Sequence, residues 1–416
     1  MIIKNFQELA RTDARKFLLE ITENVLIEYS PENYIFQYLK EKDPMKEIKE
    51  FSVISIGKAS VKMATGALKF YRERIKRCIV LTNEDEVNFQ DIEHMKTDLL
   101  ILRGDHPYPG QNSLTSTKRI IDFISNEANP ILFLVSGGGS AMLEYPRVKI
   151  DEYNRIIKCL MDNGTDIYGL NNVRCCLSNV KCGKLLNYYK GDLWVSLIIS
   201  DVPGDDPRII SSGPSIPWKY DLRSIQRKIS ICSVECPDQV QEFSYEGRLV
   251  NSVILKNRNF LDYLALKLRE RGYEVLDLGS GINMENHRLA HWIGEIYRFA
   301  IESKRDRFAI IGGGETTVEV KGNGEGGRNQ ELALRVMKEL KGNFTFLAIG
   351  TDGIDGNSIA AGAIVDNSDL NSFGLEEIET YLENNDSFTL LKRMGDAIIT
   401  GKTGNNVSDL FMLIHN

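Results

Sequence analysis

Short apolar runs alternate with amphipathic segments along most of the chain. Apolar residues recur at helical spacing in 5–29, 60–71, 151–163, 259–271, 286–303, 332–340 and 375–394. Between these segments lie short apolar runs typical of buried strands, at 51–56, 78–82, 99–102, 131–135, 193–199, 252–255, 273–278, 308–311, 344–349 and 410–414. Strands that alternate with helices predict an α/β fold of three-layer α/β/α domains with largely parallel sheets.

The length of 416 residues is more than one domain usually takes, so we expect two or three domains. Residues 208–245 contain Pro214, Pro217 and Pro237 and drift toward polar residues without periodicity. We interpret this segment as the crossover between domains and place the domains at 1–235 and 236–416.

Composition narrows the class of protein. The net charge of −7 argues against nucleic acid as the main partner. No apolar run approaches the roughly 18 residues that a membrane helix needs, and the first residues lack the apolar core of a signal peptide. The 7 cysteines show no metal-ligand spacing, so we expect free thiols in a reducing, cytoplasmic setting.

Several expected strands end directly in glycine or charged residues. Lys58 follows the strand at 51–56, and Ser136-Gly137-Gly138-Gly139-Ser140 follows the strand at 131–135. Neither junction has the spacing of a P-loop or of a nucleophile elbow. Glycines let an anion approach backbone N–H groups, and parallel sheets bind ligands at the carboxyl ends of their strands. We expect a phosphate cradle at 137–139, while Lys58 as a plain surface lysine is the alternative.

The stretch at 308–331 carries two glycine clusters, one after a strand and one before a helix. Arg328 stands in the first turn of that helix, where the helix dipole already favours anions. A guanidinium there suggests that an anion binds to Arg328 and to the start of the helix. The residues expected to hold it are Gly313, Gly314, Glu315, Gly326, Gly327 and Asn329; an ordinary loop with a surface arginine is the alternative.

Carboxylates also gather at strand ends. Asp201 and Asp205 follow the strand at 193–199, and Asp352 and Asp355 follow the strand at 344–349. Mg²⁺ takes one or two protein carboxylates where phosphates supply its other ligands. We therefore predict Asp201 as a functional carboxylate and Asp205, Asp352 and Asp355 as metal ligands, with Asx turns as the alternative around 201–206.

The order of these motifs resembles that of the glycerate 2-kinases of the MOFRL type, over essentially the whole chain. The residues that carry the resemblance are Gly57-Lys58-Ala59, Gly104-Asp105-His106-Pro107, Ser136 to Ala141, the segment with Arg174 and Lys181, Ser200 to Asp205, Gly326 to Glu331, Gly350 to Gly356 and Thr403-Gly404-Asn405-Asn406-Val407. The resemblance implies ATP- and Mg²⁺-dependent phosphorylation of D-glycerate at its 2-hydroxyl. It also implies a Rossmann-like N-terminal domain and a second α/β domain, with the active site in the cleft between the two. We also expect a homodimer in the cytoplasm.

Within that reaction, each candidate residue has a chemical role. Lys58 and Arg328 would neutralise the transferring phosphoryl group, and Asp201 would orient the attacking hydroxyl or take its proton. Arg174 is suited to bidentate binding of the glycerate carboxylate. The expected substrate-binding set comprises Ser136, Ser140, Arg174, Lys181 and Asn406, and the glycine loops would bind the nucleotide phosphates.

Two other functions stay open from the sequence. Gly322 to Gly327 spells GxGxxG before a helix, which is compatible with an NAD(P)H-dependent hydroxypyruvate reductase. A non-catalytic protein that responds to nucleotides is the third reading. Hydride transfer does not require this many phosphate-type loops and cations, so the kinase is the favoured prediction.

Overall fold

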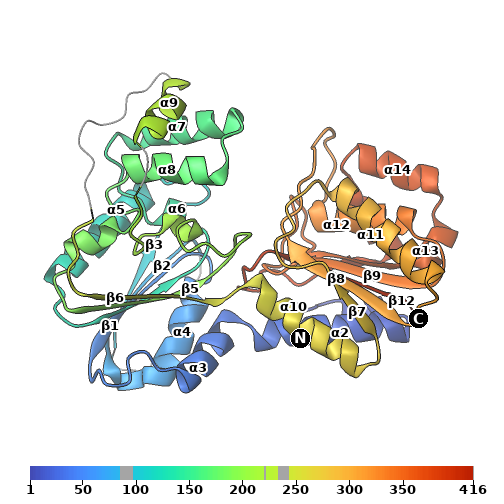
Figure 1. Ribbon diagram of the computed structural model, residues 1–416, viewed down its shortest axis with the longest axis horizontal. Coiled ribbons are helices and arrows are strands. Elements are labelled where there is room, and N and C mark those ends of the chain that lie inside the picture. The colour runs from blue at the N-terminus through green and yellow to red at the C-terminus, as the bar shows by residue number, and fades with distance from the viewer. Residues whose placement is uncertain (85–96, 220–221, 233–242, 416) are drawn as a thin grey trace. The chain divides into compact units, whose positions relative to one another are not determined.

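The computed structural model describes residues 1–84, 97–219, 222–232 and 243–415. The chain divides into two compact units (Figure 1). One, the continuous unit, spans Pro31–Leu255; the other, the split unit, combines Met1–Ser30 with Lys256–Asn416.

These units differ from the domains expected at 1–235 and 236–416. Strand β6 (Arg248–Leu255) pairs in parallel with β5 (Leu193–Ile199), so the chain leaves the first sheet only after residue 255. At the other end, helix α2 (Asp13–Glu28) packs on α10 (Asn257–Glu270), so the first thirty residues belong with the C-terminal part. The expected crossover at 208–245 therefore lies inside the continuous unit, and its residues 220–221 and 233–242 lie outside the described part.

The continuous unit is built on a six-stranded sheet whose order is β3-β2-β1-β4-β5-β6. All its described strand pairs are parallel, and the order is that of a Rossmann fold, as expected. Figure 1 shows α3 and α4 on one face and α5 and α6 on the other. The remaining strands are β1 (Phe51–Ile56), β2 (Ile75–Thr82), β3 (Asp98–Arg103) and β4 (Ile131–Val135). The helices are α3 (Pro31–Glu41), α4 (Ser60–Tyr71), α5 (Gln111–Asn126), α6 (Gly139–Met142), α7 (Ile150–Asp162), α8 (Ile167–Leu177) and α9 (Leu222–Ser230).

Helices α7, α8 and α9 have an apolar core of their own, distinct from the core under the sheet. A Cys159–Cys232 disulfide joins α7 to the residues after α9, with 6.1 Å between the Cα atoms. A second disulfide joins Cys175 to Cys182. The expectation of free thiols is therefore wrong for these four residues, while Cys78 is free and buried. Cysteines 73 positions apart give no pairing signal in sequence.

The split unit is built on a second six-stranded sheet, of order β11-β10-β9-β12-β8-β7. Figure 1 shows α2 and α10 on one face and α11 and α12 on the other. Its strands are β7 (Glu274–Asp277), β8 (Phe308–Gly314), β9 (Phe344–Gly350), β10 (Gly362–Asp366), β11 (Ala397–Ile398) and β12 (Asp409–His415). Its other helices are α1 (Phe6–Leu9), α11 (Asn286–Glu302), α12 (Arg328–Glu339), α13 (Asn367–Ser372), α14 (Leu375–Glu383) and α15 (Ser387–Met394).

This second sheet is mixed rather than largely parallel. Among its described strand pairs, β7 with β8 is parallel and the others are antiparallel. The last strand, β12, inserts between β8 and β9 in the opposite direction. Its first residue, Asp409, consequently lies beside Gly314 and Gly350, at the carboxyl ends of β8 and β9.

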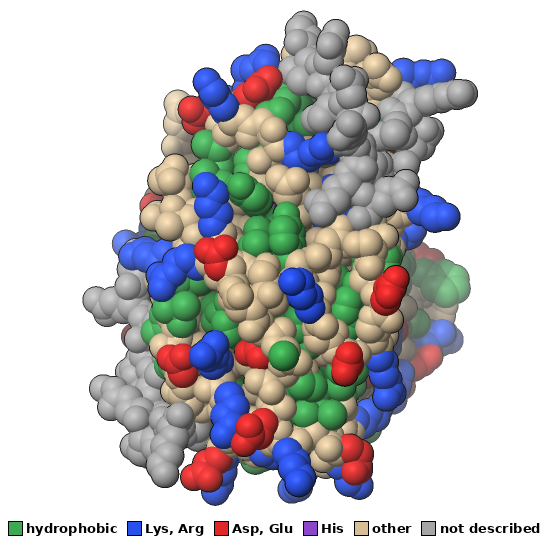
Figure 2. Space-filling model, turned by 90° about the vertical axis from the view of Figure 1, so that its left-hand side faces the viewer, with side chains coloured by type: hydrophobic (Ala, Val, Ile, Leu, Met, Phe, Trp, Pro, Cys, Tyr) green, Lys and Arg blue, Asp and Glu red, His purple; other side chains and the backbone are tan. Residues whose placement is uncertain are grey.

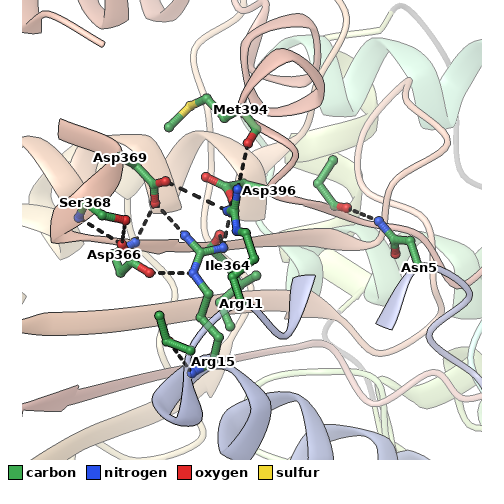
Figure 3. Close-up of polar contacts among 11 residues, drawn as sticks. Asn5, Arg11, Arg15, Ile364, Asp366, Ser368, Asp369, Met394 and Asp396 are labelled. Atoms are coloured by element: carbon green, nitrogen blue, oxygen red, sulfur yellow. Dashed lines mark hydrogen bonds and ion pairs between the residues drawn. The ribbon is translucent and has the colours of Figure 1, made fainter. Parts of the chain in front are cut away.

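Arg15 fastens the N-terminal helix α2 to the split unit (Figure 3). Its fully buried guanidinium lies 2.5 Å from Asp366, 2.5 Å from Asp369 and 2.7 Å from Asp396. Arg11, at the edge of the cluster, also pairs with Asp396. Burial raises the pKa of Asp396 to about 7, although the two arginines oppose the shift. With all three carboxylates ionised, the cluster carries one more negative than positive charge.

The described surface carries both signs of charge. On the face drawn in Figure 2, outside the grey atoms, Lys and Arg are interspersed with Asp and Glu and with small apolar areas. In the described part of the chain, no helix combines the length and the apolar character needed to cross a membrane.

Candidate functional site

In the continuous unit, two strand-to-helix turns are joined at the carboxyl ends of β1 and β4. Lys58 donates its backbone N–H to Gly137 at 2.8 Å, and Ala59 donates to the Ser136 hydroxyl at 3.0 Å. Gly57 has a φ of +106°, and a Cβ there would collide with Ser136. The Ser136 hydroxyl, fully buried, also donates to Ile56. Ser136 thus joins the two turns, which is a different role from the expected contact with substrate.

Beside these turns lies a cavity of about 290 Å³. Its lining includes Gly138 and Ser140 of the glycine loop and Arg174 of α8; the other lining residues are His106, Pro107, Tyr108, Pro109, Ala141, Tyr153, Ile157 and Met161. A Cβ on Gly138 would lie 3.0 Å from the Lys58 side chain and 3.4 Å from the His106 ring. Burial lowers the pKa of His106, and Lys58 lowers it further. The structure therefore brings Lys58, Ser140 and Arg174 to one region.

A polar chain connects the glycine loop to Arg174. The Ser140 hydroxyl lies 2.8 Å from that of Ser212, which donates to Asn171 at 2.6 Å. Arg174 donates to the same Asn171 oxygen at 3.5 Å. Ser212 and its neighbour Ser211 both have positive φ, a conformation that costs free energy and is common at functional sites. Sequence analysis missed Ser212 and Asn171; the run Ser211-Ser212-Gly213 was the available signal.

Lys181 has a different place from the one expected. Its side chain is fully buried, and its ammonium donates to the carbonyls of Ser140 at 2.9 Å and Leu143 at 2.7 Å, with Gly139 at 3.4 Å. Burial lowers its pKa to about 8, and Glu144, 4.0 Å away, opposes the shift. Lys181 thus stabilises the glycine loop through these carbonyls and does not line the cavity.

The carboxylates after β5 lie outside the cavity lining. Asp201 and Asp205 are half-buried, and neither lines the cavity. Asp205 has a positive φ of 53°. Asp206 forms a bidentate ion pair with Arg208, with contacts of 2.6 to 3.0 Å.

In the split unit, the anion that meets the start of α12 is part of the protein. The Asp355 carboxylate accepts the backbone N–H groups of Asn329 at 3.1 Å and Gln330 at 2.9 Å. It also accepts the Asn329 and Gln330 side-chain amides. Asp355 is buried, which raises its pKa, while these donors and Arg328 oppose the shift. Its oxygens are engaged by the helix, so Asp355 does not fit the expected role of metal ligand.

The glycines around α12 serve close packing rather than an open cradle. A Cβ on Gly322, Gly324 or Gly326 would collide with residues 384–387, and one on Gly327 with Asp355. The N–H groups of Gly313 and Glu315 donate to the carbonyls of Gly279 and Ile282. The expected phosphate contacts of Gly313, Gly314, Gly326 and Gly327 are therefore not supported. The GxGxxG run also lies well after the end of β8, unlike a dinucleotide fingerprint.

Arg328 is the cation of the split unit's candidate site. Its Nε lies 2.5 Å from Oδ2 of Asp409, and its Nη2 lies 3.1 Å from Oδ1. Its Nη1 donates to Glu315 at 2.6 Å. Pairing with these carboxylates raises the pKa of Arg328 against the effect of burial, so it stays charged. Burial raises the pKa of Asp409 to about 7, with Arg328 opposing.

Metal binding has little support from the protein's own donors. In the described ranges, no group of three or more His, Cys, Asp or Glu side chains could hold a metal ion. Asp352 accepts the backbone N–H of Ile354 at 3.2 Å, which is an Asx turn. Asn406 belongs to the loop before β12 in the split unit.

Comparisons with known proteins agree with the fold and with these motifs. Residues 17–244 match the model of a domain of unknown function, DUF4147, and residues 308–409 match the MOFRL family. The chain is 37% identical over 423 residues to a glycerate 2-kinase of Picrophilus torridus, covering 99% of each chain. It is 31% identical to a D-glycerate 2-kinase of Thermotoga maritima, covering 96% of this chain and 97% of that one.

A solved structure is similar as well. The crystal structure of a glycerate kinase from Thermotoga maritima superposes with a TM-score of 0.86 at 29% identity, covering 96% of this chain and 99% of that chain. Fold and motifs define a protein of two α/β units. The chain belongs to the family of MOFRL-type glycerate 2-kinases, which confirms the resemblance.

Proposed function

We propose that this protein is an enzyme, a kinase that transfers the γ-phosphoryl group of ATP to the 2-hydroxyl of D-glycerate. The observation that carries the proposal is the cavity of about 290 Å³ in the continuous unit, with a lysine beside it and an arginine and a serine in its lining. Phosphoryl transfer requires mainly positioning and cations at the transferring group. We infer the identity of the substrate and of the phosphoryl donor from the family of glycerate 2-kinases to which the chain belongs.

Arg174 is proposed to bind the glycerate carboxylate, because a guanidinium suits two carboxylate oxygens. Its tie to Ser140 through Asn171 and Ser212 orients it toward the glycine loop. Lys58 is proposed to neutralise the transferring phosphoryl group, and Asp201 to orient the substrate hydroxyl or accept its proton. Arg328, in the split unit, is proposed to bind a phosphate group. Gly137 to Gly139 are proposed to bind phosphate oxygens.

Mg²⁺ dependence is proposed from the family. The described side chains do not build a metal cage, so most ligands would come from the nucleotide's phosphates and from water. Asp205 of the continuous unit and Asp352 of the split unit are the alternative candidates for a protein ligand. We further propose a homodimer with a cytoplasmic location.

Phosphorus NMR of the products tests the function directly. After incubation with ATP, Mg²⁺ and D-glycerate, we expect the resonance of 2-phosphoglycerate. The resonance of 3-phosphoglycerate would keep the kinase and change the position of transfer. If no phosphorylated product forms, and the protein oxidises NADH when hydroxypyruvate is added in a parallel reaction, the reductase would be favoured. ATP binding without turnover would favour a non-catalytic protein.

A further inference from the structure

The two carboxylates that contact Arg328 differ in burial and in attachment. Asp409 begins β12 inside the sheet, and its side chain is 8% exposed. Glu315 follows the end of β8, and its side chain is 46% exposed. One acid is therefore part of the sheet, whereas the other can turn away into water.

The geometry at the guanidinium separates them further. Asp409 contacts the Nε and Nη2 edge with both oxygens, which is the planar bidentate arrangement that fixes guanidinium orientation. Glu315 makes a single contact, 2.6 Å from Nη1. In the described part of the chain, Nη1 is the only recorded partner of the Glu315 side chain.

Backbone contacts also hold Arg328 in place. Arg328 is the first residue of α12, and Asp355 caps the next two N–H groups of that helix. The arginine is thus fixed at its backbone by Asp355 and at its side chain by Asp409. The orientation of Arg328 therefore does not depend on Glu315, which is a second carboxylate on the same guanidinium.

The charges around Arg328 decide what happens to Glu315 when an anion binds. A phosphate group that approaches Arg328 meets a guanidinium already paired with two carboxylates. Negative charges that share one cation compete for it, so the incoming anion must displace one of them. The exposed, single-contact acid is the one that can leave at low cost.

We propose that Glu315 occupies, in the ligand-free protein, the position on Arg328 that a substrate phosphate oxygen takes, and that Asp409 stays bound and orients the guanidinium. Glu315 is a displaceable competitor and Asp409 a positioning residue. The proposal rests on the proposed function for the identity of the phosphate-bearing substrate. It gives two acids on one arginine opposite roles.

The test compares Glu315→Gln with Asp409→Asn, each of which replaces one carboxyl group on the same arginine by an amide. Affinities for ATP and for inorganic tripolyphosphate are measured by calorimetry, and kcat and KM by coupled turnover. For Glu315→Gln we expect the Kd of both anions and the KM for ATP to fall about three- to fivefold, as for a half-exposed ion pair. For Asp409→Asn we expect weaker binding and a kcat lower by about 100-fold, because the arginine is misaligned.

Asp396→Asn is the matched control, since Asp396 is another buried acid paired with an arginine in the same unit. We expect it to leave affinity and turnover unchanged. In an Arg328→Ala background, Asp409→Asn should cause no further loss of kcat, because Asp409 acts through Arg328.

Each contrary result has a distinct meaning. Weaker binding in Glu315→Gln would overturn the displacement, and tighter binding in Asp409→Asn would overturn the positioning role. Additive losses in the double variant would reduce Asp409 to a structural residue. Absence of turnover in the wild type would refute the proposed function, whereas the order of tripolyphosphate affinities would still decide the roles of the two acids.

Discussion

Replacing Arg15 with Met should destabilise the split unit strongly, and the loss should depend on pH. Methionine replaces the aliphatic part of the arginine side chain but carries no charge. The change therefore leaves Asp366, Asp369 and Asp396 without their central cation. Because Arg15 is fully buried, removing one partner of a buried ion pair is expected to cost about 3–5 kcal/mol. Arg11→Met is the matched control: the Arg11 side chain is 42% exposed, and its loss should cost at most about 1 kcal/mol.

The sign of the pH dependence follows from Asp396. Burial raises its pKa to about 7 in the folded protein, above its usual 3.8. Such a group adds stability at low pH that is lost as the pH rises through about 7. Without Arg15 the buried carboxylates bind protons even more tightly. The Arg15→Met loss should therefore be largest near pH 8 and fall to roughly half or less near pH 5.5.

Hydrogen exchange read by mass spectrometry measures this loss locally, in peptides of α2, and urea unfolding measures it for the chain. Adding Asp396→Asn to Arg15→Met should restore part of the stability at pH 8, because it removes one uncompensated charge. An equal loss at both pH values would show that packing, rather than charge, explains the role of Arg15. A loss no larger than that of Arg11→Met would refute the reasoning altogether.

Three further outcomes are expected. Lys58→Ala should abolish detectable turnover in the glycerate assay while circular dichroism stays that of the wild type; near-normal turnover would remove Lys58 from the mechanism. Lys181→Met should destabilise the continuous unit by about 2–4 kcal/mol in urea unfolding, since it leaves the carbonyls around the glycine loop without their donor and Glu144 without the nearby cation, and an unchanged midpoint would contradict that role. Joint replacement of Cys159 and Cys232 by Ser should cost up to about 4 kcal/mol, given the length of the closed loop, and should reduce the effect of a reductant on the melting temperature, which an undiminished effect would disprove.

The regular core of the fold could be predicted from sequence. Strands such as those at 51–56 and 131–135 are apolar runs bounded by polar or glycine residues, so their limits were correct. Helix α5 was missed because its buried face, Ser113, Ser116, Thr117, Ile120 and Ile124, is partly made of small polar residues. The expected single helix at 5–29 is broken after Leu9, because the Thr12 side chain caps a new helix at Asp13.

The candidate site was predictable in its residues more than in their roles. Lys58 and Ser140 were expected at one edge of the sheet, because parallel strands deliver their ends to the same edge. Arg174 lies on α8 and was singled out only by a basic stretch and by the family resemblance. The roles of Lys181 and Asp355 were not predictable, because the sequence does not show that a charge is buried against main-chain groups of the same unit. Asp409 was missed for a related reason: it starts an antiparallel strand, so its position next to Gly314 depends on a pairing between distant segments.

The split unit has a consequence for synthesis of the chain. Helix α2 leaves the ribosome before any of its partners in the C-terminal part exists, and the ion pair from Arg15 to Asp366 spans 351 positions. At ordinary rates of translation the wait is on the order of tens of seconds. During that time the whole continuous unit can fold, while apolar residues of α2 such as Leu18 and Leu26, buried in the finished protein, stay uncovered. Both chain ends belong to the split unit, so a circular permutant that starts at Lys256 would synthesise that unit without interruption and remove the delay.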